Sequence, residues 1–189
     1  MQIILQSPKK ALNKAYLKEK VSRSEIELFK TNLSVLLSKI NELEREEHHK
    51  YPFSDFLKNT WYKNLFEINT KGDFDFVIHD GKTSKDPVGT LIEVKRPSKT
   101  SEMIGKGKPN VKAFHELILY YLRERIDEDN KDIKNLIITN IYEWYIIDEK
   151  WFEEHVYRNV KLRKDYENWK LSGKDTRFFY ESIAKASRG

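Results

Sequence analysis

Hydrophobic and polar positions alternate in two segments near the middle of the chain. The first segment reads Asp73-Phe-Asp-Phe-Val-Ile-His79, and the second reads Thr90-Leu-Ile-Glu-Val-Lys95. Alternation of this kind over a short run is typical of a β-strand. Residues 80–89, between the two segments, are dense in Asp, Gly, Ser and Pro, which favours an exposed turn. We therefore expect a β-hairpin here.

The faces of these strands separate charged side chains from apolar ones. Side chains alternate along a strand, so Glu93 and Lys95 point one way while their apolar neighbours point the other way. A hairpin centred on Ser84 would place Asp75 directly across from Glu93. Two carboxylates and an amine are then expected to converge at a strand end. Asp73 shares the strand face of Asp75 and is the alternative carboxylate.

Apolar residues spaced by three and four predict helices on both sides of the hairpin. The first pattern runs from Ile26 to Leu43, with Ser24 and Glu27 as a capping box. We expect this helix to continue until Pro52 stops it. The second pattern runs from Val111 to Ile126 and predicts an amphipathic helix directly after the candidate site.

The other segments complete a mixed pattern of helices and strands. Residues 54–61 predict a short helix, residues 136–139 and 144–147 predict two further strands, and the charged, aromatic tail from 151 to 180 predicts helices. The order helix, hairpin, helix, strand, strand is typical of an α/β fold in which helices flank a central mixed β-sheet.

Length and composition indicate one folded domain with additions at its ends. The 189 residues, of which 39% are hydrophobic and 13% aromatic, can form a real core. We expect an N-terminal arm over residues 1–22, the core domain over 23–155, and a helical C-terminal extension over 156–189. The chain has no cysteine, which excludes disulfides and thiolate zinc sites and fits a cytoplasmic protein. No apolar stretch approaches the roughly 20 residues that a membrane helix needs, so no membrane contact is expected.

Positive charge is concentrated just after the second strand of the hairpin. The whole chain carries a formal charge of +5. Between positions 95 and 112 there are six cations and one anion, Glu102, so this stretch alone also carries +5. Such a patch attracts a phosphate polymer, although a lysine-rich loop can also serve only solubility. The candidate DNA-binding residues are Arg96, Lys99, Lys106, Lys108 and Lys112.

The converging carboxylates suggest metal-assisted chemistry. Two carboxylates with few other protein ligands suit Mg²⁺, with Mn²⁺ as a substitute, because Mg²⁺ keeps several waters and takes further ligands from phosphate. A lysine beside the cation can orient or help deprotonate a metal-bound water that attacks phosphorus. His48 and His49 are a poor pair of zinc ligands, because neighbouring side chains on a helix point in different directions.

Asp75 followed by Glu93-x-Lys95 resembles the PD-(D/E)xK nuclease signature. The wider pattern consists of Gly89-Thr-Leu-Ile-Glu-Val-Lys-Arg-Pro-Ser98, the helix pattern over 110–122, and Ile138-Thr-Asn-Ile-Tyr-Glu-Trp144. It is similar to the N-terminal nuclease domain of type IIG restriction–modification enzymes, single chains that both cut and methylate DNA. The resemblance covers roughly residues 25–155. The sequence lacks the Asn-Pro-Pro-Tyr/Phe motif of the methyltransferase part.

This resemblance implies a restriction-endonuclease-like core and a metal-dependent type II site-specific deoxyribonuclease activity on double-stranded DNA. Asp75, Glu93 and Lys95 would be catalytic, with Asp75, Glu93 and the backbone carbonyl of Val94 holding the metal. Nucleases with this core often add a glutamate from the first helix, for which we favour Glu47 over Glu46. The implied partners are methyltransferase and target-recognition domains of a longer chain, with a transient homodimer for double-strand cleavage.

Two other functions fit the same residues. One is a noncatalytic nucleic-acid-binding or assembly module built on the same core. The other is a stand-alone repair or junction-cutting nuclease, for which homodimerisation and a preference for branched DNA would be expected. Divalent-ion binding distinguishes the first of these from a nuclease.

Overall fold

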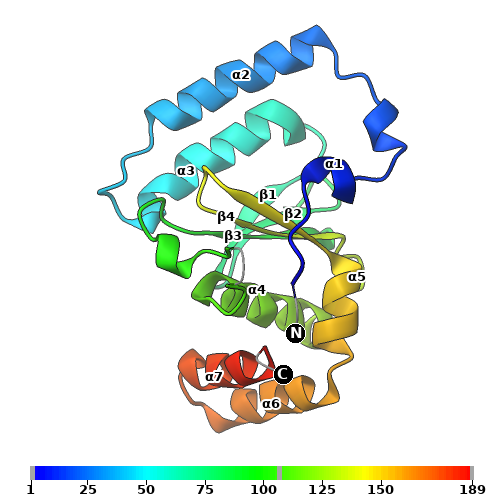
Figure 1. Ribbon diagram of the computed structural model, residues 1–189, viewed down its shortest axis with the longest axis vertical. Helices are drawn as coiled ribbons and strands as arrows, with labels where there is room; N and C mark the ends of the chain where they lie inside the picture. The colour runs from blue at the N-terminus through cyan, green and yellow to red at the C-terminus, as the bar shows by residue number, and fades with distance from the viewer. Residues whose placement is uncertain (1–2, 106–107, 188–189) are drawn as a thin grey trace.

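The fold is a central five-stranded β-sheet with helices on both faces (Figure 1). The computed structural model describes residues 3–105 and 108–187. β3 and β4 are parallel, and the other neighbouring strands are antiparallel, so the predicted α/β class with a mixed central sheet is confirmed. The strands lie in chain order as β1 (Ile68–Lys71), β2 (Phe74–His79), β3 (Val88–Val94), β4 (Asn135–Thr139) and β5 (Trp144–Asp148).

The helices form layers above and below the sheet. Figure 1 shows α2 and α3 on one side of the sheet, α4 on the other, and α6 and α7 stacked outside α4. No helix in the described ranges is long and apolar enough to cross a bilayer. The longer helices are α2 (Arg23–Ser38), α3 (Glu46–Leu57), α4 (Lys112–Leu122), α6 (Val160–Ser172) and α7 (Thr176–Ala186). Shorter helical segments are α1 (Pro8–Ala11), α5 (Glu149–Phe152), 3-10 turns at Tyr16–Lys18 and Thr100–Glu102, and π-helical turns at Lys58–Tyr62, Arg123–Asp127 and Glu153–Tyr157.

The hairpin register agrees with the sequence prediction. Phe76 pairs with Ile92, and the next pairs along the ladder keep the same register until an irregularity after Ile78. This register centres the hairpin on Ser84 and brings Asp75 opposite Glu93. The prediction combined a hairpin centred on Ser84 with strand alternation, which excludes a slip by one residue because such a slip would turn every side chain to the other face.

Each face of the sheet packs against its own core. Phe76, Ile92 and Val94 belong to the core under α2 and α3. Val77 and Leu91, one position along each strand, belong to the core under α4. Glu93 and Lys95 therefore lie on the α4 face, as their alternation with Ile92 and Val94 requires.

The predicted first helix is in fact two helices. Its capping box consists of Ser22 and Glu25 rather than the predicted Ser24 and Glu27. The first of the two helices, α2, ends at Ser38. The guanidinium of Arg96 donates to the backbone carbonyls of Glu42 and Leu43 in the connection to α3. A contact between residues more than fifty positions apart thus stabilises the break, and no local pattern reports it.

The prediction that Pro52 stops the helix is wrong. It lies inside α3, which continues to Leu57 and directly into the π-helical turn that follows. Proline removes one helical hydrogen bond. Pro52 and its helical neighbours Phe53 and Phe56 are buried against the sheet, and this packing offsets the lost bond.

The C-terminal helices pack against the core under α4. Tyr166 of α6 and Phe179 and Ile183 of α7 are fully buried in the core that α4 shares with the sheet. The boundary predicted at residue 155 falls within the π-helical turn Glu153–Tyr157, ahead of these helices. Residues 4–22 are exposed throughout. The edge strand β1 was not predicted, because it is short and carries polar residues.

Adjacent phenylalanines in α7 test this layered arrangement. Phe179 is 1% exposed, whereas Phe178 is 51% exposed. We expect Phe179→Ala to lower the free energy of unfolding by about 3–5 kcal/mol, because the cavity opens beneath α4. Phe178→Ala should cost less than about 1 kcal/mol. Urea unfolding of both variants measures the difference, and equal losses would contradict the packing of α7 into the core.

Candidate active site

The three residues of the sequence signature meet at one end of the hairpin. Asp75 comes from β2, Glu93 from β3, and Lys95 follows β3 directly. Their exposed fractions are 5%, 1% and 2%, so all three side chains are buried. Burial of three ionisable groups costs free energy unless they neutralise and hydrogen-bond one another.

Lys95 joins three elements through its ammonium group. The Nζ atom contacts Oε1 of Glu93 on the same strand. It also lies 2.7 Å from Oε2 of Glu116 on α4 and 3.8 Å from Oε2 of Glu46 at the start of α3. Burial alone would lower the pKa of Lys95, but these three carboxylates outweigh it and raise the pKa above its ordinary value. Lys95 is therefore a permanent cation in the site.

Asp75 is held by one bond from the sheet and one from a helix. Its Oδ2 accepts a hydrogen bond of 2.8 Å from the Val94 backbone N–H. Its Oδ1 lies 2.7 Å from Nζ of Lys50 on α3. The side chain of Lys50 is 26% exposed, so this ion pair lies at the solvent side of the cluster.

The backbone carbonyl of Val94 points toward Asp75. The Lys95 N–H of the same peptide unit donates to the Thr139 carbonyl on β4, at 2.7 Å. None of the described peptide bonds is cis. In a trans peptide the N–H and C=O point in opposite directions. The Val94 carbonyl is therefore directed away from β4, toward the strand that carries Asp75.

Glu93 carries an oxygen that the protein leaves unsatisfied. Its Oε2 is buried and has no hydrogen-bond partner among the described residues. Burial raises the pKa of Glu93, the nearby Asp75 carboxylate raises it further, and Lys95 opposes the shift. An unpaired buried carboxylate oxygen is costly and marks a position that a cation would stabilise.

These donors fit a hard divalent cation with an incomplete protein shell. Asp75 Oδ1, Glu93 Oε2 and the Val94 carbonyl are all oxygen ligands, which Mg²⁺ prefers, and Mg²⁺ commonly takes only one or two carboxylates. Across the described ranges, no group of three or more His, Asp and Glu side chains is arranged to hold a metal. The remaining ligands of a cation here would therefore come from water or substrate.

The charge balance of the cluster also favours a divalent cation. Asp75, Glu93, Glu116 and Glu46 are four carboxylates, whereas Lys95 and Lys50 are two ammonium groups, which leaves a formal charge of −2. Outside the cluster, exposed Lys112 approaches the outer oxygen of Glu116 to 3.6 Å. Inside it, no further cation of the described residues pairs with these four carboxylates within 4 Å.

Helix register decides which acidic residues reach the site. Glu46 and Lys50, one turn apart on α3, point toward it, whereas Glu47 is exposed. The structure thus brings Glu46 to Lys95 in place of the favoured Glu47. Burial raises the pKa of Glu46, and Lys95 opposes this shift. Asp73, the alternative to Asp75, is exposed and pairs with Arg123 at 3.0 Å, outside the cluster.

The predicted DNA-binding residues are only partly available. Lys99, Lys108 and Lys112 are exposed. Arg96 is used within the protein, where it holds the connection between α2 and α3. Lys106 lies outside the described residues. Three of the five predicted contacts are therefore placed on the surface after β3.

Sequence reasoning did not assign Lys50 or Glu116 to the site. The signal for Lys50 was its spacing of four from Glu46, which places both on one helical face. The signal for Glu116 was its position in α4, because most residues of this helix are buried and a carboxylate among them needs a partner. Neither signal identifies the partner without the fold.

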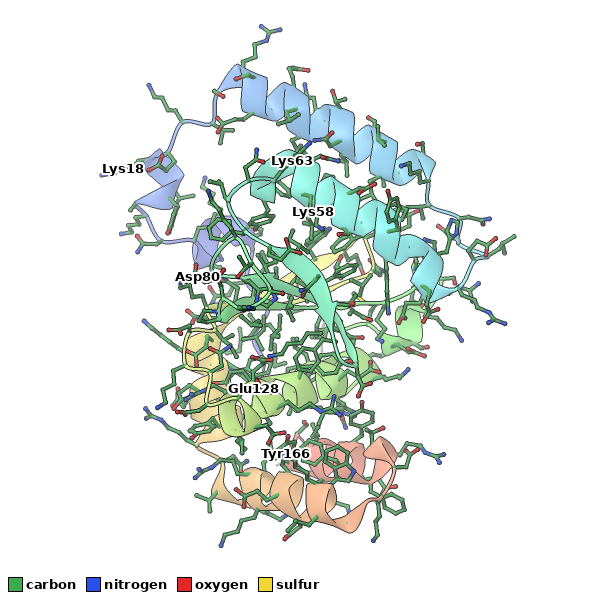
Figure 2. All side chains as sticks on the ribbon, turned by 180° about the vertical axis from the view of Figure 1, so that it is seen from behind. Lys18, Lys58, Lys63, Asp80, Glu128 and Tyr166 are labelled. Atoms are coloured by element: carbon green, nitrogen blue, oxygen red, sulfur yellow. The ribbon has the colours of Figure 1, made fainter. Side chains whose placement is uncertain are left out.

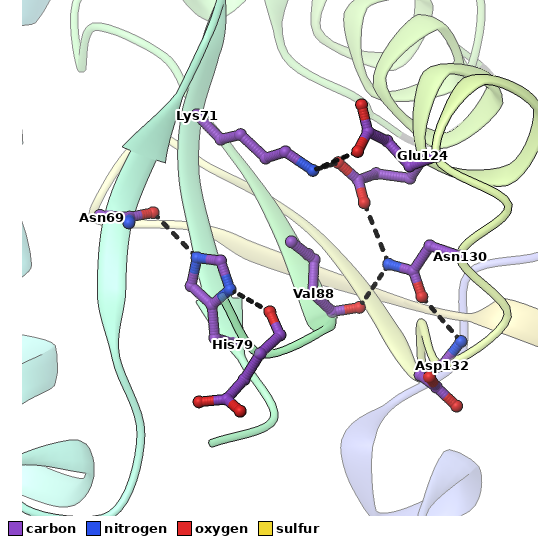
Figure 3. Close-up of polar contacts among 9 residues, drawn as sticks. Asn69, Lys71, His79, Val88, Glu124, Asn130 and Asp132 are labelled. Carbon is purple, nitrogen blue, oxygen red and sulfur yellow. Dashed lines mark hydrogen bonds and ion pairs between the residues drawn. The ribbon is translucent and has the colours of Figure 1, made fainter. Parts of the chain in front are cut away.

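A second buried polar network lies at the other end of β3 (Figure 3). Glu124, which is 1% exposed, contacts Lys71 and accepts a 3.0 Å hydrogen bond from the Asn130 side chain. Asn130 also donates to the Val88 carbonyl at 2.9 Å. His79, on the Asp75 face, hydrogen-bonds the Asn69 side chain and the Asp86 carbonyl. This network fixes the start of β3 and does not contact the signature residues.

Comparison with known proteins gives one family. A family model described as a domain of unknown function (DUF7149) matches residues 6–188, which includes every described helix and strand. No curated protein and no solved structure shows a significant match to the chain.

Removal of the Lys95 ammonium tests the electrostatics of the cluster. In Lys95→Met, Glu93 and Glu116 lose their buried cation, and we expect the free energy of unfolding to fall by about 3–5 kcal/mol at pH 8. The pKa of Glu93 is already raised and should rise further, so the folded variant binds this proton more tightly than the unfolded chain does. The loss of unfolding free energy in Lys95→Met, relative to the unmodified protein, should therefore become smaller as the pH falls from 8 to 5.

Lys112→Met is the control for this substitution, because Lys112 is half exposed and its ion pairs are longer than 3.5 Å. It should cost less than about 1 kcal/mol at either pH. Urea unfolding at both pH values provides the measurement. A Lys95→Met deficit that does not change with pH would show that Glu93 is not the group left unpaired.

Proposed function

This chain belongs to the DUF7149 family, and we propose that it is a metal-dependent DNA endonuclease domain that hydrolyses phosphodiester bonds. The observation that carries the proposal is the buried cluster of Asp75, Glu93 and Lys95 at the end of a hairpin. Burial raises the pKa of Glu93, and a buried carboxylate of this kind beside a second one is costly and occurs mainly where it serves chemistry.

In this proposal the protein supplies ligands and charge. Asp75 Oδ1, Glu93 Oε2 and the Val94 carbonyl would hold Mg²⁺ or Mn²⁺. The bound ion supplies Lewis acidity at phosphate and a more acidic bound water. Lys95, which is always charged, orients the attacking water and stabilises the negative charge that develops on phosphorus oxygens. Glu116 and Glu46 keep the Lys95 ammonium in place for this task.

The wider assignment to a type IIG restriction–modification enzyme rests on the sequence resemblance and the order of elements. The hairpin that carries Asp75 and Glu93 is followed by α4 and then by β4, which pairs in parallel with β3. We propose that this is a restriction-endonuclease-like core. Sequence recognition and methylation would belong to other domains, and the isolated domain would cut with low sequence specificity because phosphate contacts carry no sequence information.

Double-stranded DNA is the proposed substrate. The exposed lysines at positions 99, 108 and 112 follow β3, which carries Glu93, and α4 begins at Lys112. Charge of this sign near the cluster would bring the phosphate backbone to the metal ligands. Cutting both strands needs two active sites, for which we propose a transient homodimer on DNA.

One observation favours a second function, a noncatalytic nucleic-acid-binding module. Both metal-ligand candidates are already neutralised within the protein, Asp75 by Lys50 and Glu93 by Lys95. In a module of this kind the two ion pairs would remain in place, and no metal ion would replace the lysines. Binding of Mn²⁺ distinguishes the two functions, because only the nuclease requires it.

The nuclease proposal predicts Mn²⁺ binding and plasmid nicking that both depend on Glu93. Glu93→Gln keeps the size of the side chain and removes its charge, so we expect loss of detectable Mn²⁺ binding by calorimetry. Nicking of supercoiled plasmid with Mg²⁺ or Mn²⁺ should fall by about 100-fold or more. A chelator should abolish nicking by the unmodified protein.

Glu128→Gln is the matched control, since Glu128 is largely exposed and lies at the end of the π-helical turn after α4 (Figure 2). It should leave both measurements unchanged. Failure of the unmodified protein to bind Mn²⁺ would contradict the nuclease proposal, and so would full activity of Glu93→Gln.

DNA affinity should depend on salt through the exposed lysines. We expect Lys99→Ala and Lys108→Ala each to weaken binding to DNA of any sequence. Each should also reduce the slope of log affinity against log salt by about 1, because one phosphate contact is lost. Fluorescence anisotropy over a salt series measures the slope. Lys164→Ala, an exposed lysine on α6, should change neither quantity; equal effects at all three positions would argue against a defined DNA surface.

A further inference from the structure

Lys50 is a second lysine in the cluster, and its environment differs from that of Lys95. Its Nζ lies 2.7 Å from Asp75 Oδ1, and its side chain is 26% exposed. Burial works against the charge on Lys50, but contact with Asp75 and the nearby Glu46 and Glu47 outweigh it and raise its pKa. The ammonium is therefore a stable cation at the solvent side of the site.

We propose that Lys50 is a built-in competitor of the divalent cation: in the metal-free protein its ammonium occupies the position at Asp75 that the metal would take. This inference rests on the proposed metal site, and it adds a residue that sets the affinity of that site. Lys50 would have to leave Asp75 before the cation binds there.

Competition follows from the oxygens that Asp75 has available. Oδ2 is engaged by the Val94 N–H at 2.8 Å, and Oδ1 is the oxygen that Lys50 contacts. An ammonium and a metal ion both approach a carboxylate oxygen within about 3 Å, and two cations so close to one another repel each other strongly. An ammonium at Oδ1 therefore opposes the binding of a metal ion to the same oxygen.

Lys50 can leave the site, whereas Lys95 cannot. Lys95 is 2% exposed and touches three carboxylates, so its departure would strand all of them in a buried position. Lys50 has one ion-pair partner within 4 Å among the described residues, and its side chain is 26% exposed. Four flexible methylene groups let its ammonium swing into solvent, where it is well hydrated.

The competition can be measured as metal affinity without any cleavage assay. Lys50→Met keeps a similar side-chain length and removes the charge, and we expect it to bind Mn²⁺ about tenfold more tightly than the unmodified protein in calorimetry. Lys50→Arg keeps a cation beside Asp75 and should retain the weaker affinity.

Lys58→Met is the matched control (Figure 2). Lys58 follows Lys50 by about two turns, at the end of α3, so the same charge is lost from the same helical segment. Its Mn²⁺ affinity should equal that of the unmodified protein. A gain that is equal in Lys50→Met and Lys58→Met would reflect net charge alone and would overturn the inference.

A second measurement uses the unmodified protein, and so does not depend on the folding of any variant. Acetylation of lysines by an amine reagent, followed by mass spectrometry, reports how free each ammonium group is. Mn²⁺ should increase the labelling rate of Lys50 and leave that of Lys58 unchanged. An unchanged rate at Lys50 in protein that binds Mn²⁺ would show that the metal does not displace it.

The outcomes separate this inference from the proposed function. Mn²⁺ binding by the unmodified protein with equal or weaker binding by Lys50→Met overturns the inference and leaves the nuclease proposal intact. Absence of binding by every protein, including Lys50→Met, overturns both. Mn²⁺ binding by the unmodified protein that becomes about tenfold tighter in Lys50→Met, and not in Lys58→Met, supports competition directly.

Discussion

The buried ammonium of Lys95 is the interaction on which the arrangement of the molecule depends. A lysine that is 2% exposed keeps its charge only if carboxylates surround it, and these come from β3, α4 and α3. The sheet and the helices on its two faces are thus joined at the Nζ atom of Lys95. Apolar side chains of similar volume would pack at least as well without the cost of removing charge from water. The cluster is therefore better explained by a function than by stability.

Two glutamates, Glu116 and the fully buried Glu124, hold β3 against the same helical segment at both ends of the strand. Glu116 meets Lys95 just after the strand, and Glu124, eight residues later, reaches the start of the strand through Asn130 (Figure 3). Eight residues are about two helical turns, so both carboxylates lie on the same side of this segment. β3 is thereby a rigid base for Glu93, whereas the α3 residues Glu46 and Lys50 have side chains that are 27% and 26% exposed. The contribution of α3 is the part of the site most able to change.

The sequence predicted the features that depend on local alternation, and it failed where distant contacts decide. The register of β2 against β3, and with it the meeting of Asp75 and Glu93, followed from strand periodicity together with a hairpin centred on Ser84. The break after Ser38 depends on Arg96, which the charge pattern had assigned to DNA. Pro52 is tolerated because the helix around it is buried. The choice between Glu46 and Glu47 required the start of α3, and helix ends are set by capping and tertiary contacts that apolar spacing does not report.

Two lysines with different exposure solve a problem that any buried carboxylate cluster faces. In the proposed metal site, the cluster would fold before a cation binds, and without cations the carboxylates would repel one another and favour their protonated forms. A single fully buried lysine would leave Asp75 without a cationic partner. Lys50 on α3 neutralises Asp75, and its flexible stem and 26% exposed side chain would let it leave when a cation binds. Under this proposal, stronger pairing of Lys50 with Asp75 stabilises the metal-free protein and weakens its affinity for the metal.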